Sequence, residues 1–195
     1  MIVLKSAQEL EVMRSASRIV AEVHERLAEH VTPGVTTFEL DALAEEWTLA
    51  SGATPAFKGY KGYPFTLCIS VNDEVVHGMP NRRRILKDGD IVGLDFGVVY
   101  KGYYGDAART RAVGTVTPQA QRLMRVTEEC LYKGIEAAKA GWRVGDIGFA
   151  VQQHAEAAGY SVVRDFVGHG IGTRLHEEPQ IPNFGEAGRG KPLKV

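Results

Sequence analysis

The sequence predicts a mixed α/β (α+β) fold in which pairs of helices alternate with strands. Apolar residues recur at helical spacing over residues 7–32 and 36–51, and again over 118–138 and 146–158. Between these helix pairs, residues 66–113 consist of apolar, β-rich runs separated by Asn, Asp and Gly turn signals. The order helix–helix–sheet, then helix–helix–strand, predicts two related halves, of which the second is incomplete.

Capping patterns mark the start of the first two helices. Ser6 followed by Glu9 is a capping box, and the apolar spacing continues from there until Pro33-Gly34 ends the run. Thr36 followed by Glu39 repeats the pattern and predicts a second helix that stops near the next glycine.

Three strands are expected in the first half, over Thr66–Val71, Ile91–Val99 and Tyr103–Val113. A hairpin that turns at Tyr100-Lys101 would join the last two. In the second half, Tyr160–Val167 is the expected strand.

The second pair of helices also has start signals. Thr117-Pro118 is a cap followed by proline at the first helical position, and Asp146 is the expected cap of the next helix. Three histidines lie among Glu and Gln on predicted helix faces and are expected to face solvent: His24, His30 and His154.

Composition indicates an ordinary water-soluble domain. The chain has 195 residues and a formal net charge of −1, so bulk charge favours neither nucleic acid nor membrane as a partner. Cys68 and Cys130 do not suggest a disulfide framework, and no run approaches the ~18 apolar residues of a membrane span. We therefore expect one domain in the reducing cytoplasm.

A metal site is predicted from Asp95, Asp106 and His169. Carboxylate oxygen and imidazole nitrogen suit a borderline divalent metal. The hairpin would place Asp95 directly opposite Asp106, where two unpaired carboxylates repel unless a cation lies between them. An Asp in a strand–turn–strand sequence is usually a solvated turn residue. However, Asp95 lies inside the apolar run 91–97, where burial is expected.

Four motifs together resemble the methionine aminopeptidases of the bacterial, type I kind. They are the segment Cys68–Pro80, the Asp95/Asp106 pair, the segment Gly168–Gly172, and His176 followed by Glu-Glu-Pro. The resemblance runs over essentially the whole chain, in the family's order and at its spacings. It implies the pita-bread fold, with a central antiparallel sheet and helices on its outer face. It also implies removal of the initiator methionine when the next residue is small.

The same resemblance implies two divalent metal ions (Co, Mn, Fe or Zn) held by five side chains. Asp95, Asp106 and His169 match three of these ligands, and the other two are glutamates on strands that follow the His-Glu-Glu-Pro segment. We therefore expect residues 1–195 to be a catalytic domain that lacks its C-terminal strands. By itself, this chain should have little or no activity.

The resemblance also assigns the residues that contact the substrate. His77 matches the histidine at the scissile amide, and His176 matches the one that hydrogen-bonds the substrate carbonyl. Tyr60, Tyr63 and Cys68 align with the wall of the methionine pocket, while Phe57 and Leu175 fall at pocket positions that vary. The expected partners are the N-termini of peptides and nascent chains, near the ribosome, and the full-length protein is expected to be a monomer.

Two other functions stay open at this point. One is a catalytically inactive pita-bread module that binds peptides or proteins, although such relatives generally lose the ligand residues that this chain has. The other is a related hydrolase such as an Xaa-Pro aminopeptidase. Those enzymes usually carry a large extra N-terminal domain, whereas the motifs here begin within the first third of the chain.

Overall fold

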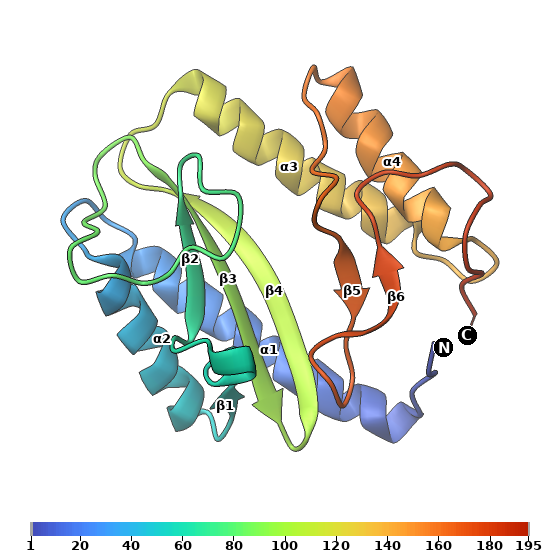
Figure 1. Ribbon diagram of the computed structural model, residues 1–195, viewed down its shortest axis with the longest axis horizontal. Helices are drawn as coiled ribbons and strands as arrows, with labels where there is room; N and C mark the ends of the chain where they lie inside the picture. The colour runs from blue at the N-terminus through green and yellow to red at the C-terminus, as the bar shows by residue number, and fades with distance from the viewer. Residues whose placement is uncertain (1, 195) are drawn as a thin grey trace. The chain divides into compact units, whose positions relative to one another are not determined.

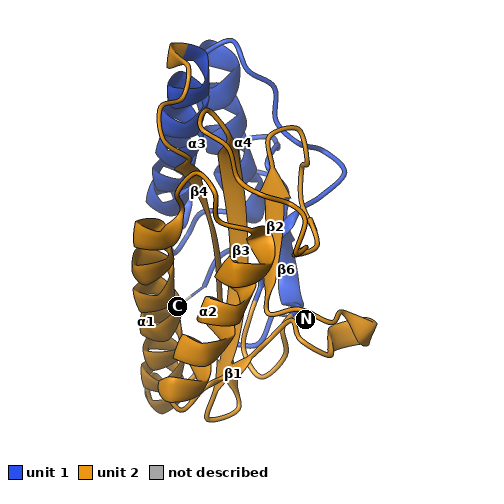
Figure 2. Ribbon diagram, turned by 90° about the vertical axis from the view of Figure 1, so that its left-hand side faces the viewer, with its two compact units in different colours: residues 1–4, 119–170, 176–195 blue, residues 5–118, 171–175 orange. Residues whose placement is uncertain are grey.

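The computed structural model describes residues 2–194 and divides into two compact units (Figures 1 and 2). Unit 2 comprises residues 5–118 and 171–175, and unit 1 comprises residues 1–4, 119–170 and 176–195. No helix within residues 2–194 has the length and hydrophobicity needed to cross a membrane.

Unit 2 contains the first helix pair and a sheet. Its helices are α1 (Ala7–His30) and α2 (Thr37–Ala50), its short 3₁₀ helix is Tyr60–Gly62, and its strands are β1 (Thr54–Pro55), β2 (Leu67–Val71), β3 (Ile91–Tyr100) and β4 (Tyr103–Ala112). Both capping boxes form as predicted, with the side chains of Ser6 and Thr36 accepting hydrogen bonds from the backbone of Glu9 and Glu39.

The sheet of unit 2 is antiparallel, and its two faces differ in chemistry. β3 pairs with β4 along one edge and with β2 and β1 along the other. One face carries Leu94, Phe96 and their buried neighbours and packs against α1 and α2 to form the main core (Figure 1). Because successive side chains alternate between faces, Asp95 lies on the opposite face.

The hairpin between β3 and β4 turns one residue later than predicted. Tyr100 pairs with Tyr103, so the turn is Lys101-Gly102, and both residues have positive φ angles, +49° and +83°. A two-residue turn of this kind matches the twist of the flanking strands, and the glycine adopts its φ without strain. In this register Asp95 pairs with Ala108 and Asp106 with Gly97. The expectation of directly opposite aspartates is therefore wrong, and the two are diagonal neighbours.

Unit 1 contains the second helix pair and two short strands. They are α3 (Pro118–Ala137), α4 (Val144–Ala157), β5 (Gly168–Gly170) and β6 (Glu177–Ile181). The predicted strand over 160–167 does not form. The chain is irregular there, and the strand begins only at Gly168. Asp146 is also not the cap of α4. It is the third residue of α4, within the first turn, and its side chain accepts the backbone N–H of Arg143 at 2.7 Å.

The two halves repeat one hydrogen-bond pattern. In unit 2, the backbone of Gly34 and Val35 before α2 pairs with Leu86. In unit 1, Gly141 and Trp142 before α4 pair with Leu193 in the same way. Each segment thus anchors the start of the second helix of its half.

Helix α1 and strand β4 lie in very close contact at Gly105. A Cβ atom on Gly105 would come within 2.7 Å of the backbone carbon of Ala16. Only glycine allows the strand to approach the helix backbone this closely.

We therefore predict that Gly105→Ala lowers the free energy of unfolding by about 1–3 kcal/mol, because the added methyl group pushes β4 away from α1. Urea unfolding measures the loss. Gly93→Ala is the matched control in β3. Its nearest neighbour would be 3.7 Å away, an ordinary contact, so its stability should change by less than about 1 kcal/mol. Equal losses in the two variants would contradict this account of the packing.

Candidate active site

The two candidate carboxylates lie on one face of the unit 2 sheet, opposite to the helices. Asp95 comes from β3 and Asp106 from β4, and they are diagonal across the strand pair. Diagonal residues on neighbouring strands lie ~7–8 Å apart across the strand pair, so two carboxylates at such positions can lean toward one another. Both residues are partly buried.

The electrostatics of this pair are unfavourable without a cation. Burial and then the neighbouring charge of Asp106 raise the pKa of Asp95 to about 7. Removing water disfavours the charged form of a carboxyl group, and a second carboxylate disfavours it further. The pair therefore holds a proton or binds a positive charge near neutral pH.

An apolar cluster lines the same face beside the carboxylates. Cys68 of β2 is the cross-strand partner of Asp95. It packs with the four other residues predicted for the methionine pocket and with Ala56, Val99 and Tyr104; the four are Phe57, Tyr60, Tyr63 and Leu175. Leu175 arrives from the short segment 171–175, which joins the sheet through a hydrogen bond from the Tyr104 backbone N–H to the Gly172 carbonyl at 2.9 Å.

Cys68 lies in this apolar cluster as a neutral thiol. Burial raises its pKa to about 11 and also raises the pKa of Tyr63. The hydroxyl of Tyr63 donates to the Leu67 carbonyl at 2.8 Å. Neutral sulfur and aromatic groups form a surface suited to a thioether or another apolar side chain.

His77 is exposed and lies in a loop that is bound to the edge of β2. The Gly78 carbonyl accepts the Ile69 N–H at 2.7 Å, and the Ser70 hydroxyl accepts the Gly78 N–H at 3.1 Å. His77 itself has a φ of +61°, which is uncommon for a residue with a side chain. Such strained backbone occurs often at functional positions, where the surrounding structure enforces it.

His169 and His176 lie together within unit 1. Their ring centroids are 4.2 Å apart. The ring of His169 donates from Nδ1 to the Gly170 carbonyl at 3.0 Å. Because a carbonyl oxygen only accepts, the neutral ring carries its hydrogen on Nδ1 and keeps its lone pair on Nε2, which is the arrangement found in metal-binding histidines.

The candidate ligands fit a divalent metal by their chemistry. Asp95 and Asp106 supply two oxygens in need of a cation, and His169 supplies an oriented imidazole nitrogen. Within residues 2–194, no group of three or more His, Cys, Asp or Glu side chains is gathered closely enough to hold a metal ion. The carboxylate pair belongs to unit 2 and the histidine pair to unit 1.

Two buried polar residues were not found by sequence reasoning. Asp41 of α2 accepts the backbone N–H groups of Thr66 and Leu67, both at 2.8 Å, and so fixes the start of β2. Its place among the buried positions of α2 is the signal that could have revealed it. His24 was expected to face solvent but is only 1% exposed, because α1 turns this position toward the sheet.

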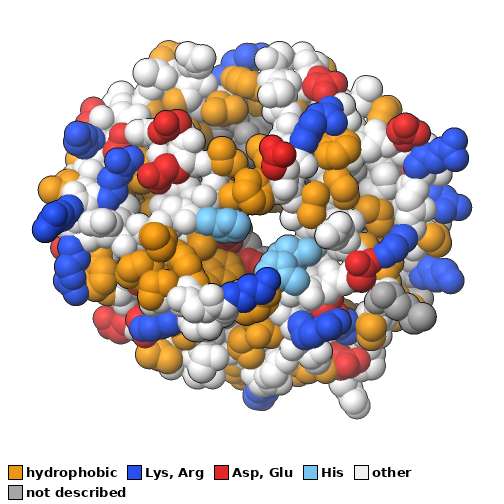
Figure 3. All heavy atoms as spheres, viewed as in Figure 1, with side chains coloured by type: hydrophobic (Ala, Val, Ile, Leu, Met, Phe, Trp, Pro, Cys, Tyr) orange, Lys and Arg blue, Asp and Glu red, His pale blue; other side chains and the backbone are white. Residues whose placement is uncertain are grey.

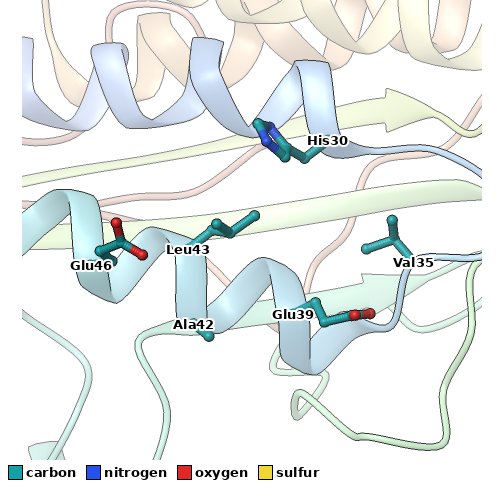
Figure 4. Close-up of a pocket in the computed structure, with 6 residues that line it drawn as sticks. All are labelled: His30, Val35, Glu39, Ala42, Leu43 and Glu46. Carbon is teal, nitrogen blue, oxygen red and sulfur yellow. The ribbon is translucent and has the colours of Figure 1, made fainter.

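A hollow lies in the helical layer of unit 2. It has a volume of about 390 Å³ and lies between α1 and α2 (Figure 4). Its lining contains none of the candidate site residues: His30, Val35, Glu39, Ala42, Leu43 and Glu46. The candidate carboxylates and the apolar cluster around Cys68 lie on the opposite face of the sheet.

The raised pKa of Asp95 predicts a pH-dependent penalty on folding. A carboxyl group with a raised pKa in the folded chain loses stability as pH rises from about 4 to about 7, because the unfolded chain ionises more readily. With EDTA present, Asp95→Asn should therefore be more stable than the unchanged chain at pH 8, by more than about 1 kcal/mol. The difference should shrink as pH falls toward 4.

Urea unfolding at both pH values measures this effect. Replacing the exposed Asp73 by Asn is the control and should change stability by less than about 0.5 kcal/mol. An Asp95→Asn variant that is less stable than the unchanged chain at pH 8 would show that the carboxylate is satisfied without a cation.

Comparison with known proteins identifies the family. The profile of metallopeptidase family M24 matches residues 11–195. A methionine aminopeptidase of Clostridium perfringens is 53% identical over 193 residues, covering 99% of this chain and 77% of the relative. Methionine aminopeptidase 1 of Bacillus subtilis is 49% identical over 194 residues, covering 100% of this chain and 78% of the relative. This chain thus spans about three quarters of the length of each relative.

Solved structures agree with these matches. The crystal structure of a methionine aminopeptidase from Thermotoga maritima superimposes with a TM-score of 0.98 at 44% identity, covering 100% of this chain and 78% of that one. A prolidase from Pyrococcus furiosus, 24% identical, has a TM-score of 0.82 over 98% of this chain and 55% of its own, which establishes the shared fold alone. The fold is the predicted pita-bread fold, and the chain belongs to metallopeptidase family M24.

Proposed function

We propose that this chain supplies the substrate pocket and three of the metal ligands of a metal-dependent aminopeptidase, which removes the initiator methionine when the second residue is small. The observation that carries the proposal is the partly buried Asp95/Asp106 pair beside the apolar cluster that contains Cys68. A charged pair that needs a cation, next to a surface suited to an apolar side chain, is the combination that this hydrolysis requires. Relatives about 50% identical bear the name methionine aminopeptidase.

Asp95, Asp106 and His169 are the proposed metal ligands, and the metals are two divalent ions such as Co, Mn, Fe or Zn. The ligand chemistry does not select among these ions, and availability decides in cells. When bound, such ions lower the pKa of water toward ~7 and polarise a carbonyl group, so that hydrolysis proceeds at neutral pH. The two glutamates expected from the family resemblance would complete the ligand set.

Two histidines are proposed to act on the peptide itself. His77 would contact the scissile amide nitrogen, and its clamped backbone would hold the ring in place as the bond breaks. His176 would donate a hydrogen bond to the substrate carbonyl and stabilise the negative charge that develops there. Tyr60, Tyr63 and Cys68 would surround the methionine side chain and exclude water from it.

The two rival functions receive less support. A peptide-binding module without catalysis has no need for a desolvated carboxylate pair, which lowers stability. An Xaa-Pro aminopeptidase or prolidase shares the fold, but the identity to such a protein is only 24%.

We also propose a cytoplasmic location and peptide N-termini as partners, near the ribosome, for a protein that is a monomer at full length. Cys68 and Cys130 are free thiols, which suits a reducing compartment. Acidic and basic side chains are interspersed over the face shown in Figure 3, which favours a peptide over a nucleic acid as partner.

Methionine release from a Met-Gly-led peptide tests the function. The 195-residue chain is assayed with Mn²⁺ or Co²⁺, against a Lys-Gly-led peptide and against Asp106→Asn. The same assay is run on the chain extended by the C-terminal segment of the Clostridium perfringens relative. We expect little or no release from the chain alone, and methionine-selective, EDTA-sensitive release from the extended chain. Asp106→Asn should reduce that release at least ~100-fold.

Silence of both proteins would favour the binding module. Release that ignores the first residue, or that survives Asp106→Asn, would contradict the proposed specificity or the proposed metal site. Peptide binding that persists in the silent Asp106→Asn protein is expected under either function and serves as the folding control.

A further inference from the structure

A buried histidine of α1 contacts the sheet from the face opposite to the carboxylates. His24 is 1% exposed, and its Nε2 lies 3.0 Å from the Ala107 carbonyl oxygen. Because the carbonyl oxygen only accepts, Nε2 carries the hydrogen and donates it. The ring also stands edge-on against Phe96, with 5.9 Å between centroids.

This imidazole is costly to bury. Its Nδ1 is buried and has no hydrogen-bond partner among residues 2–194. Burial lowers the pKa of His24 and keeps the ring neutral; the charged groups that face it are Glu25 on its own helix and Arg109 and Arg111 on β4, while β3 presents the uncharged Phe96. A leucine would fill this space without an unsatisfied nitrogen. What the imidazole adds is its hydrogen bond to Ala107.

The hydrogen bond from His24 reaches the residue that directly follows Asp106, opposite the residue that directly follows Asp95. Phe96 and Ala107 are cross-strand partners, Phe96 directly follows Asp95, and Ala107 directly follows Asp106. On the other side of Asp106, Gly105 packs against the α1 backbone at Ala16. Helix α1 therefore holds β4 immediately before and immediately after Asp106.

The strand that receives this contact needs support from outside the sheet. Among residues 2–194, β4 pairs only with β3, so its other edge has no strand partner. An edge strand shifts more easily than a central one. Ala107 faces Phe96 in the β3–β4 ladder, and His24 adds a further donor to the Ala107 carbonyl from the helix side of the sheet.

We propose that His24 is a positioning residue for the Asp95/Asp106 pair, holding β4 at Ala107 so that the two carboxylates keep the spacing that a metal site requires. It acts through the backbone and touches neither carboxylate nor substrate. The inference rests on the proposed metal-binding function. It adds a residue from the helical layer that tunes the affinity of the site from behind the sheet.

Metal affinity and stability, measured together, test this role in three variants of the chain. His24→Leu removes the donor, and His24→Gln keeps an N–H at a similar reach. Val20→Ala, also buried in α1, weakens the same core without touching the Ala107 carbonyl. Mn²⁺ affinity is measured by calorimetry and stability by urea unfolding. We expect His24→Leu to bind Mn²⁺ about 10-fold more weakly, the range typical for lost partners of metal ligands. His24→Gln should stay within about threefold of the unchanged chain, as should Val20→Ala despite its lost stability.

Unchanged Mn²⁺ affinity in His24→Leu would overturn the proposal. So would an equal loss of affinity in Val20→Ala, because the effect would then follow stability alone.

Asp106→Asn separates this inference from the proposed function. If the unchanged chain and Asp106→Asn both fail to bind Mn²⁺, the three proposed ligands do not hold the ion by themselves, and amide hydrogen exchange over residues 104–108 then decides the positioning role. Faster exchange there in His24→Leu than in Val20→Ala supports it. Equal exchange in the two variants contradicts it.

Discussion

The repulsion between two partly desolvated carboxylates, Asp95 and Asp106, is the constraint around which unit 2 is arranged. On a sheet surface open to water, each would ionise with little effect on its neighbour. Here burial and mutual charge raise the pKa of Asp95 to about 7, so the metal-free fold carries a penalty at neutral pH. A divalent cation between the carboxylates would remove that penalty, and under the proposed function it would also activate the water that hydrolyses the peptide.

One face of the unit 2 sheet carries most of the stabilising core, and the other carries the candidate site. The face with Leu94 and Phe96 buries a large apolar core under α1 and α2, which supplies the free energy to hold an unfavourable pair on the other side. The carboxylate face carries the smaller cluster around Cys68. Close contacts from α1 at Gly105 and Ala107 keep the edge strand β4 in register.

Sequence reasoning found the four helices and the three long strands of unit 2 but missed details that depend on long-range packing. The capping boxes at Ser6 and Thr36 are local signals, so the helix starts were predictable. The hairpin register was not, because Lys101 adopts a positive φ that its side chain disfavours and that the whole strand pair enforces. The burial of His24 was missed because Glu25 and Arg26, which follow it, suggest a polar face. The position lies four residues after Val20 and three before Leu27, both buried, so it belongs to the core face of α1. The irregular segment 160–167 has the apolar composition of a strand without a partner to pair with among the described residues.

The most direct test of the central claim is a carbon-13 NMR titration of the Asp95 carboxyl group, with and without Zn²⁺, a diamagnetic ion. The account predicts a pKa of about 7 in the metal-free chain and a carboxylate that stays ionised down to about pH 4 once Zn²⁺ is bound. An Asp95 that titrates near pH 4 without metal, and does not respond to Zn²⁺, would contradict the account. The pair would then be an ordinary solvated feature of the sheet.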